Sequence, residues 1–215
     1  MKTVEKRGRT EDEAIVAALA ELGVSRAEAR IEVLEEARAG LFGLLGGREA
    51  RVRVTVLPSR EEFVEDLLRQ VLVQMLGEEP VVERRPAEEY FQLVVAADER
   101  AGILIGHHGE TLEALQYLLN VAAQQAERRG DIRAGGPRLL LDVAGYRERR
   151  SETIERMVKR AVAEVRRTGR PETLEPMTAH ERKQVHVLLG DHPDLASRSE
   201  GEEPHRQVVI SKREA

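Results

Sequence analysis

A Gly-x-x-Gly tetrapeptide lies in the middle of the chain, after a short apolar run and before a long amphipathic pattern. Its residues are Gly106, His107, His108 and Gly109. Glycine lets a backbone pass close to a phosphate, and the free N–H groups at the start of a helix attract anions. The loop therefore suits the backbone of a nucleic acid, although the same four letters also occur in plain tight turns. We expect Ile103, Leu104 and Ile105 to form part of a groove beneath the bases.

A second candidate pair stands near the C-terminus, where Arg182 precedes His186 by four residues. Side chains at this spacing share one face of a helix. The guanidinium of Arg182 can hold a phosphate through its fork of N–H groups, and the ring of His186 can hydrogen-bond or stack. The alternative is an ordinary solvated helix face.

Basic residues are concentrated in one part of the chain. The whole chain has a net charge of -5, but residues 138–170 carry ten basic and five acidic residues, while 57–99 carry four basic and eleven acidic. Arg149 and Arg150 begin a basic helix face that continues to Arg170. This face suits a track of phosphates, but amphipathic helices also carry surface arginines without binding anything.

Catalysis and metal binding find little support in the residue types. The chain has six histidines and no cysteine. His180, His186 and His192 are six residues apart, a spacing that does not bring helical zinc ligands to one face. No nucleophile elbow, phosphate-binding P-loop or HExxH occurs in the sequence. We therefore expect no enzyme activity, no cofactor and no metal site.

The elements that position the Gly-x-x-Gly loop form one pattern over residues 57–145. Ser59 is expected to cap a helix to about Leu76, with an apolar face of Phe63, Leu67, Val71 and Met75. Strands are expected at 81–84 and 90–96. After the loop comes a helix to about residue 129, with Leu112, Leu115, Leu118, Leu119 and Ala122 on its apolar face, and then a strand at 138–143.

The flanking segments predict two further domains. Over 1–56 we expect an initial strand, a helix capped by Thr10 and Glu13, strands at 30–36 and 51–56, and an apolar glycine-rich turn at 40–47. Over 146–215 we expect a helix to about Thr168, a helix capped by Thr178, an acidic turn-rich segment at 191–204 and a strand at 208–210. The fold class is therefore α+β, with three small domains. Because charges are spread throughout and no apolar run approaches membrane-spanning length, we expect a cytoplasmic protein without a membrane span.

Several strings resemble the Jag family, also called SpoIIIJ-associated protein, KhpB or EloR. The run from Gly102 to Leu118, GILIGHHGETLEALQYL, resembles the family's KH segment. The strings GYRERR from Gly145, RTGRP from Arg167 and LEPM from Leu174 resemble its C-terminal domain. The N-terminal unit is similar to the Jag-N domain, so the resemblance extends over nearly the whole chain.

The resemblance implies a bacterial RNA-binding regulator with a central type II KH fold and a C-terminal Arg-x-x-x-His domain for single-stranded nucleic acid. It implies Ile105, the loop from Gly106 to Gly109, and the pair Arg182 and His186 as binding residues, beside Arg149 and Arg150. Members are linked to cell elongation, division and cell shape. The implied partners are single-stranded RNA, or alternatively DNA, and either a small single-KH protein or a second copy of the chain.

One departure concerns the loop, where the family usually has a Lys or Arg and this chain has two histidines. Histidine is mostly neutral near pH 7, so we expect a weaker electrostatic contribution there. A rival interpretation is a protein-docking scaffold that acts through the N-terminal domain, using Leu41, Phe42, Leu44 and Leu45 of the glycine-rich turn. These four side chains can equally fill a small core.

Overall fold

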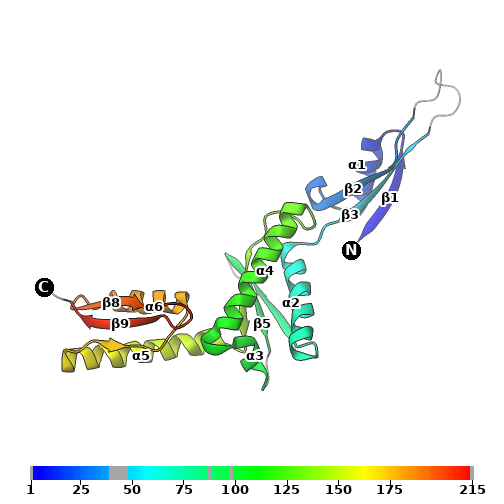
Figure 1. The fold of residues 1–215 in the computed structure, drawn as a ribbon. Helices are drawn as coiled ribbons and strands as arrows, with labels where there is room; N and C mark the ends of the chain where they lie inside the picture. Colours follow the sequence, from blue (N-terminus) through cyan, green and yellow to red (C-terminus); the bar gives the residue numbers. More distant parts are fainter. Residues whose placement is uncertain (1, 39–47, 87–88, 97–98, 214–215) are drawn as a thin grey trace. The chain divides into compact units, whose positions relative to one another are not determined.

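The computed structural model describes residues 2–38, 48–86, 89–96 and 99–213. The chain forms two compact units, which we describe separately. The first contains residues 1–79, 86–92 and 116–140, and the second contains 80–85, 93–115 and 141–215. Helices and sheets occur in both units (Figure 1), which confirms the α+β fold class. The glycine-rich turn at 40–47 lies outside the described residues, and the limits 1–56, 57–145 and 146–215 remain a prediction.

The first unit begins with a three-stranded antiparallel sheet in the order β1-β3-β2. Its elements are β1 (Thr3–Gly8), α1 (Glu11–Leu22), the 3₁₀ turn η1 (Arg26–Glu28), β2 (Ala29–Glu35) and β3 (Ala50–Val56). Val52 and Val54 alternate with polar residues in β3 and are completely buried against α1. This period of two lets the sheet bury one face only. Val33 of β2 is exposed, and the register of β2 against β3 shifts between Val33 and Glu35.

Helix α1 is capped nearly as its sequence predicts. The hydroxyl of Thr10 accepts a hydrogen bond from the Glu13 amide at 3.1 Å. The Glu13 carboxylate accepts from the amide of Arg9 rather than from that of Thr10, at 2.8 Å. The cap therefore satisfies two amides, one of them a residue earlier than a capping box would.

Helix α2 (Arg60–Leu76) begins with a full capping box. The amide of Glu62 donates to Ser59 Oγ at 3.2 Å, and the amide of Ser59 donates to Glu62 Oε2 at 2.7 Å. The predicted apolar face of α2 was wrong by one residue, because the buried row is Val64, Leu68 and Leu72. Phe63, Leu67, Val71 and Met75 form the neighbouring row and are half-buried. Two adjacent rows of this helix are apolar, so periodicity alone does not tell which one faces the core.

The central sheet has the order β4-β5-β6. Its strands are β4 (Val82–Pro86), β5 (Tyr90–Val95) and β6 (Arg138–Val143), and its later helices are α3 (Ala101–Ile105), η2 (His107–Gly109) and α4 (Glu110–Arg129). The order α2, β4, β5, α3, α4, β6 confirms the KH element order. Within the first unit, buried Asn120 on α4 accepts from the amide of Leu139 and donates to its carbonyl, at 3.0 and 3.1 Å.

The second unit ends in a domain built on the sheet β7-β9-β8. Its elements are α5 (Tyr146–Thr168), β7 (Glu172–Thr173), α6 (Ala179–Leu189), β8 (Leu195–Glu200) and β9 (Gln207–Lys212), with both helices against the sheet (Figure 1). Ile154, Val158 and Val165 of α5 pack on Val208 and Ile210. The turn-rich prediction for 191–204 was wrong in part, because β8 lies within it. Its sequence LASRSE is polar, and its pairing with β9 determines that it is a strand.

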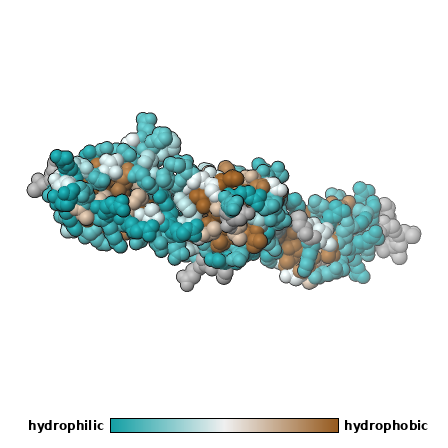
Figure 2. All heavy atoms as spheres, turned by 90° about the horizontal axis from the view of Figure 1, so that it is seen from below, coloured by the Kyte–Doolittle hydropathy of each residue, from teal (hydrophilic) through white to brown (hydrophobic). Residues whose placement is uncertain are grey.

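The surface is mostly hydrophilic, with separate apolar patches on the face shown in Figure 2. Leu118 was predicted to face the core but is 60% exposed, beside Tyr117 at 68%. The buried apolar positions of α4 are Leu112, Leu115, Leu119, Ala123 and Ala126. Across the described ranges, no helix combines the length and the apolar character that a membrane crossing requires.

Candidate nucleic-acid interface

The Gly-x-x-Gly loop connects α3 to α4 through a backbone that only glycine fits at its first position. Gly106 has φ 72° and ψ −172°, and its amide closes α3 by donating to the carbonyl of Gly102 at 2.9 Å. A Cβ atom at Gly106 would stand 2.2 Å from the hydroxyl oxygen of Thr111. The side chain of Thr111 fills the space that a Cβ would need, so position 106 admits no side chain.

The second glycine is in contact with the first residue of helix α5. Gly109 has φ 86°, and a Cβ there would lie 3.0 Å from Cε1 of Tyr146, the first residue of α5. Burial raises the pKa of the Tyr146 hydroxyl above its ordinary value. The aromatic ring of Tyr146 lies against the backbone of the loop at Gly109.

The two histidines occupy the turn between the glycines. Their ring centroids lie 3.9 Å apart in an edge-to-face arrangement, and His108 adopts φ 50°. His107 is exposed, whereas His108 is half-buried with Nδ1 at 3.7 Å from Glu175 Oε1. The carboxylate of Glu175 therefore lies beside the loop, next to His108.

The three apolar residues before the loop differ in their exposure to solvent. Leu104 is buried in the core, so its predicted place in the groove was wrong. Ile103 is 51% exposed, and Ile105 is half-buried immediately before Gly106. In a single turn of helix α3, only one of three successive side chains can point fully inward. Ile103 and Ile105 are therefore the two apolar side chains of this run that remain at the surface.

Arg149 and Arg150 have different environments. Arg149 is exposed and its guanidinium donates to the carbonyl of Ala144. The Arg150 side chain is only 12% exposed; its Nε donates to Glu181 Oε1 at 2.6 Å and its Nη1 to Glu175 Oε1 at 2.8 Å. Burial opposes the charge of Arg150, but these two hydrogen bonds raise its pKa above the ordinary value. Arg150 therefore neutralises two carboxylates next to the loop.

Arg182 and His186 both lie on α6, but their side chains are held by other parts of the same domain. Arg182 Nη1 donates to the carbonyl of Met177 at 2.8 Å, and Nη2 donates to Glu203 Oε1 at 2.6 Å. The His186 ring nitrogens lie 2.7 and 3.0 Å from the hydroxyls of Ser197 and Ser199 on β8. The pair thus connects α6 to β8 and to the turn that follows it.

Two helices of the second unit carry exposed rows: the basic row on α5 belongs to the helix face predicted from the sequence, whereas the row on α6 was not identified from the sequence. On α6, residues His180, Lys183 and Val187 face solvent, a set with spacings of three and four residues. On α5, spacings of seven, four and seven residues bring Arg149, Arg156, Arg160 and Arg167 to nearly one line opposite the buried side. Plotting the residues of α6 at 100° per residue would have revealed the second row as well.

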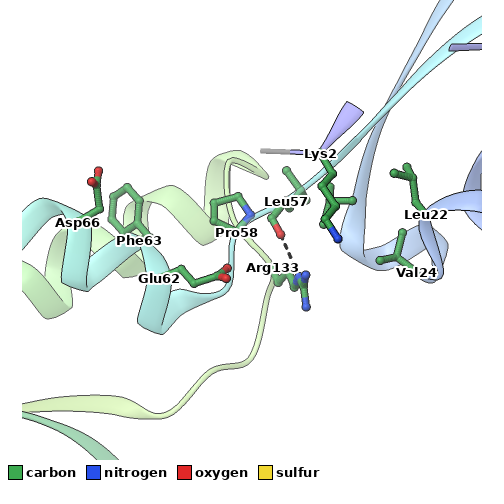
Figure 3. A pocket seen from close by; sticks show the side chains of 10 residues that line it. Lys2, Leu22, Val24, Leu57, Pro58, Glu62, Phe63, Asp66 and Arg133 are labelled. Carbon is green, nitrogen blue, oxygen red and sulfur yellow. Dashed lines mark hydrogen bonds between the residues drawn. The ribbon is translucent and has the colours of Figure 1, made fainter. Parts of the chain in front are cut away.

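A cleft of about 720 Å³ lies elsewhere, within the first unit. Figure 3 shows Arg133 at its edge, where Nε donates to the carbonyl of Leu57 at 2.9 Å. The lining residues are Lys2, Leu22, Val24, Val56, Leu57, Pro58, Glu62, Phe63, Asp66 and Arg133. None of the predicted binding residues lines this cleft. Among the residues with described positions, no three His, Asp or Glu side chains are grouped as metal ligands would be.

Comparison with known proteins assigns a family to each segment. Residues 6–56 match the Jag N-terminus, residues 61–133 match the KH domain of KhpA/KhpB, and residues 152–212 match the R-3-H domain, named for Arg-x-x-x-His. The chain is 34% identical to RNA-binding protein KhpB of Clostridium symbiosum, over 100% of this chain and 94% of that protein. It is 28% identical to RNA-binding protein KhpB of Bacillus subtilis, over 98% and 99% of the two chains. This chain belongs to the KhpB, or Jag, family.

Proposed function

We propose that the protein binds single-stranded RNA through the Gly-x-x-Gly loop between α3 and α4. The observation that carries this proposal is the tight loop itself, in which Gly106 and Gly109 both have positive φ and the 20-residue helix α4 begins at Glu110, immediately after Gly109. Such a loop brings backbone N–H groups against a phosphate chain and holds about four nucleotides. The relatives named RNA-binding protein KhpB support RNA as the ligand.

The proposed contacts to RNA are made by surface side chains of the loop and its neighbours. Ile103 and Ile105 contact bases, His107 and His108 contact phosphates, and Arg149 extends the basic surface. Arg150, Arg182 and His186 contribute indirectly. Their side chains are held by Glu181, Glu203 and Ser197, and these contacts position the surrounding residues of the interface. Discrimination between RNA and DNA then depends on contacts to the 2′-hydroxyl.

The test is fluorescence anisotropy of labelled single-stranded RNA with the wild type and a double variant, His107→Asp with His108→Asp. Two carboxylates in the loop would repel phosphates, while aspartate tolerates the left-handed backbone of position 108. We expect the variant to bind at least about tenfold more weakly, a difference of about 1.4 kcal/mol.

A matched control adds two negative charges away from the loop, on helix α4, as Gln124→Glu with Gln125→Glu. Both positions are exposed and distant in sequence from the loop. The control should bind within about threefold of the wild type, because charges separated by more than a Debye length are screened. Equal affinity of the loop variant and the wild type would overturn the proposal.

At the level of the cell, we propose a regulator of elongation, division and cell shape that acts on cytoplasmic transcripts, as the resemblance to the Jag family implies. A small single-KH protein or a second copy of the chain is the proposed protein partner. Co-purification of the tagged protein from its own host, followed by sequencing of bound RNA, would identify both. Recovery of protein partners with no enrichment of RNA would favour the scaffold function instead.

A further inference from the structure

A polar cluster, which we call the seam, connects the Gly-x-x-Gly loop to the start of helix α6. Its members are Glu113, Arg150, Glu175, Thr178 and Glu181. All of them lie in the second unit, as does the loop itself. The seam is built from side chains of α4, α5, α6 and the segment before α6.

The first connection joins α4 to the cap of α6. The hydroxyl of Thr178 donates to Glu113 Oε1 at 3.0 Å. Thr178 is also the N-cap of α6, where its amide donates to Glu181 Oε2 at 2.9 Å. One residue therefore begins α6 and fixes that beginning against the first turn of α4.

The second connection runs through Arg150. This guanidinium joins Glu181 of α6 to Glu175, and Glu175 Oε1 lies 3.7 Å from Nδ1 of His108 in the loop. The side chains of Arg150 and Glu181 are 12% and 8% exposed. Charged groups with so little solvent are held in one arrangement, because separating them would leave buried charges unpaired.

The backbone between β6 and α5 is also constrained. Ala144 and Gly145 connect β6 to α5, both with positive φ. The buried carboxylate of Asp142 accepts from the amides of Gly145 and Arg147 at 3.0 and 3.2 Å. The junction therefore has its dihedral angles fixed by hydrogen bonds rather than acting as a free linker.

We infer that the Gly-x-x-Gly loop and the exposed first turns of α6 form one continuous site for a single strand longer than four nucleotides, with the seam holding the two parts in register. This inference rests on the proposed RNA binding. Glu175 and Thr178 are three residues apart, at most about 10 Å, so α6 begins within a short distance of His108. A strand that leaves the loop on this side meets His180 and Lys183, which are exposed on α6.

The physical consequence is a gain from linking two weak contacts. When two binding surfaces are rigidly positioned, the second contact forms at a high effective concentration after the first. If they move independently, this gain falls. Glu113, Arg150, Glu175, Thr178 and Glu181 are therefore positioning residues that determine how affinity depends on strand length.

The test compares the affinity for RNAs of five and twelve uridines, in the full chain and in a seam variant, Glu113→Ala with Glu175→Ala. This variant leaves the buried pair of Arg150 and Glu181 intact. A control, Asp191→Ala with Glu202→Ala, removes two exposed carboxylates outside the seam. The number of registers on the longer strand is the same for all three proteins, so a change in the affinity ratio reports the linkage.

We expect the seam variant to keep or increase its affinity for the five-nucleotide RNA and to lose at least about fivefold of the twelve-to-five ratio. The control should keep the wild-type ratio. A seam variant with an unchanged ratio would overturn the inference, as would a wild type that binds both lengths with a ratio no greater than the number of registers explains. In both cases RNA binding itself would stand, whereas binding of neither length would remove the proposed function and the inference together.

Discussion

The buried guanidinium of Arg182 forms an ion pair with the exposed carboxylate of Glu203, with Nη2 and Oε1 2.6 Å apart. The Arg182 side chain is 8% exposed and the Glu203 side chain 57%. The same guanidinium holds the carbonyl of Met177 just before α6. The arginine of the Arg-x-x-x-His pair is thus part of the framework of its domain, with its guanidinium already paired to a carboxylate and a backbone carbonyl.

Replacement of Arg182 by Ala should destabilise the C-terminal domain. It leaves the Met177 carbonyl without its donor and a cavity beside α6, so we expect a loss of about 3 kcal/mol in the free energy of unfolding. Glu203→Gln removes the charge from an exposed partner and should cost less than about 1 kcal/mol. Urea unfolding followed by circular dichroism measures both. A loss of equal size for the two variants would show that the buried environment of Arg182 does not matter.

Gly106→Ala should destabilise the fold although it adds only one methyl group. The new Cβ would collide with Thr111, and φ at this position is positive, so we expect a loss of at least about 2 kcal/mol. Gly102→Ala is the control, because nothing lies within 4 Å of its Cβ position and it lies inside α3. Thermal unfolding should show a lower Tm for the first variant only. Equal Tm values would contradict the close packing of Thr111 on the loop.

The sequence predicted those features of the fold that depend on residues close together in the chain. The helix caps at Ser59 and Thr178 depend on residues three apart, and both helices begin where the sequence predicted. The glycine loop was identified for the same reason. The strand β8 could not be predicted, since its polar residues become a strand only by pairing with β9.

The environments of the candidate binding residues could be predicted even less. Arg182 and its partner Glu203 are 21 residues apart, and Arg150 and Glu181 are 31 apart. A local sequence pattern does not show which arginine of a basic helix forms an ion pair with a buried carboxylate. The sequence therefore indicated the right helices for the site, while the tertiary structure determines which of their side chains remain exposed.

Asn120→Ala should weaken the attachment of β6 to α4. The variant leaves the amide and the carbonyl of Leu139 without their buried partners, and we expect a loss of about 2 kcal/mol in the free energy of unfolding. Gln124→Ala on the exposed side of the same helix should change it by less than about 0.5 kcal/mol. Native-state hydrogen exchange should show faster exchange of the Leu139 amide in the first variant. Unchanged exchange would mean that this hydrogen bond contributes nothing to local stability.

The ion pair of Arg166 with Asp194 should make stability depend on pH in the acid range. The hydrogen bonds from Arg166 lower the pKa of Asp194 from 3.8 to about 2 in the folded chain. A lowered folded-state pKa gives stability that is present above the unfolded value and is lost as pH falls from about 4 to about 2. Urea midpoints of the wild type and Asp194→Asn should therefore differ at pH 6 and converge towards pH 2. A difference that is constant with pH would exclude this titration as its cause.

The measurement that tests RNA binding by the loop most directly is a titration of the isotope-labelled protein with a short single-stranded RNA, observed through its amide NMR signals. At low ratios of RNA to protein, we predict the largest shifts for the amides of residues 105–111, with smaller shifts in the first turns of α6. Shifts confined to other parts of the chain, with the amides of Gly106 and Gly109 unchanged at saturation, would contradict the assignment of the Gly-x-x-Gly loop as the RNA clamp.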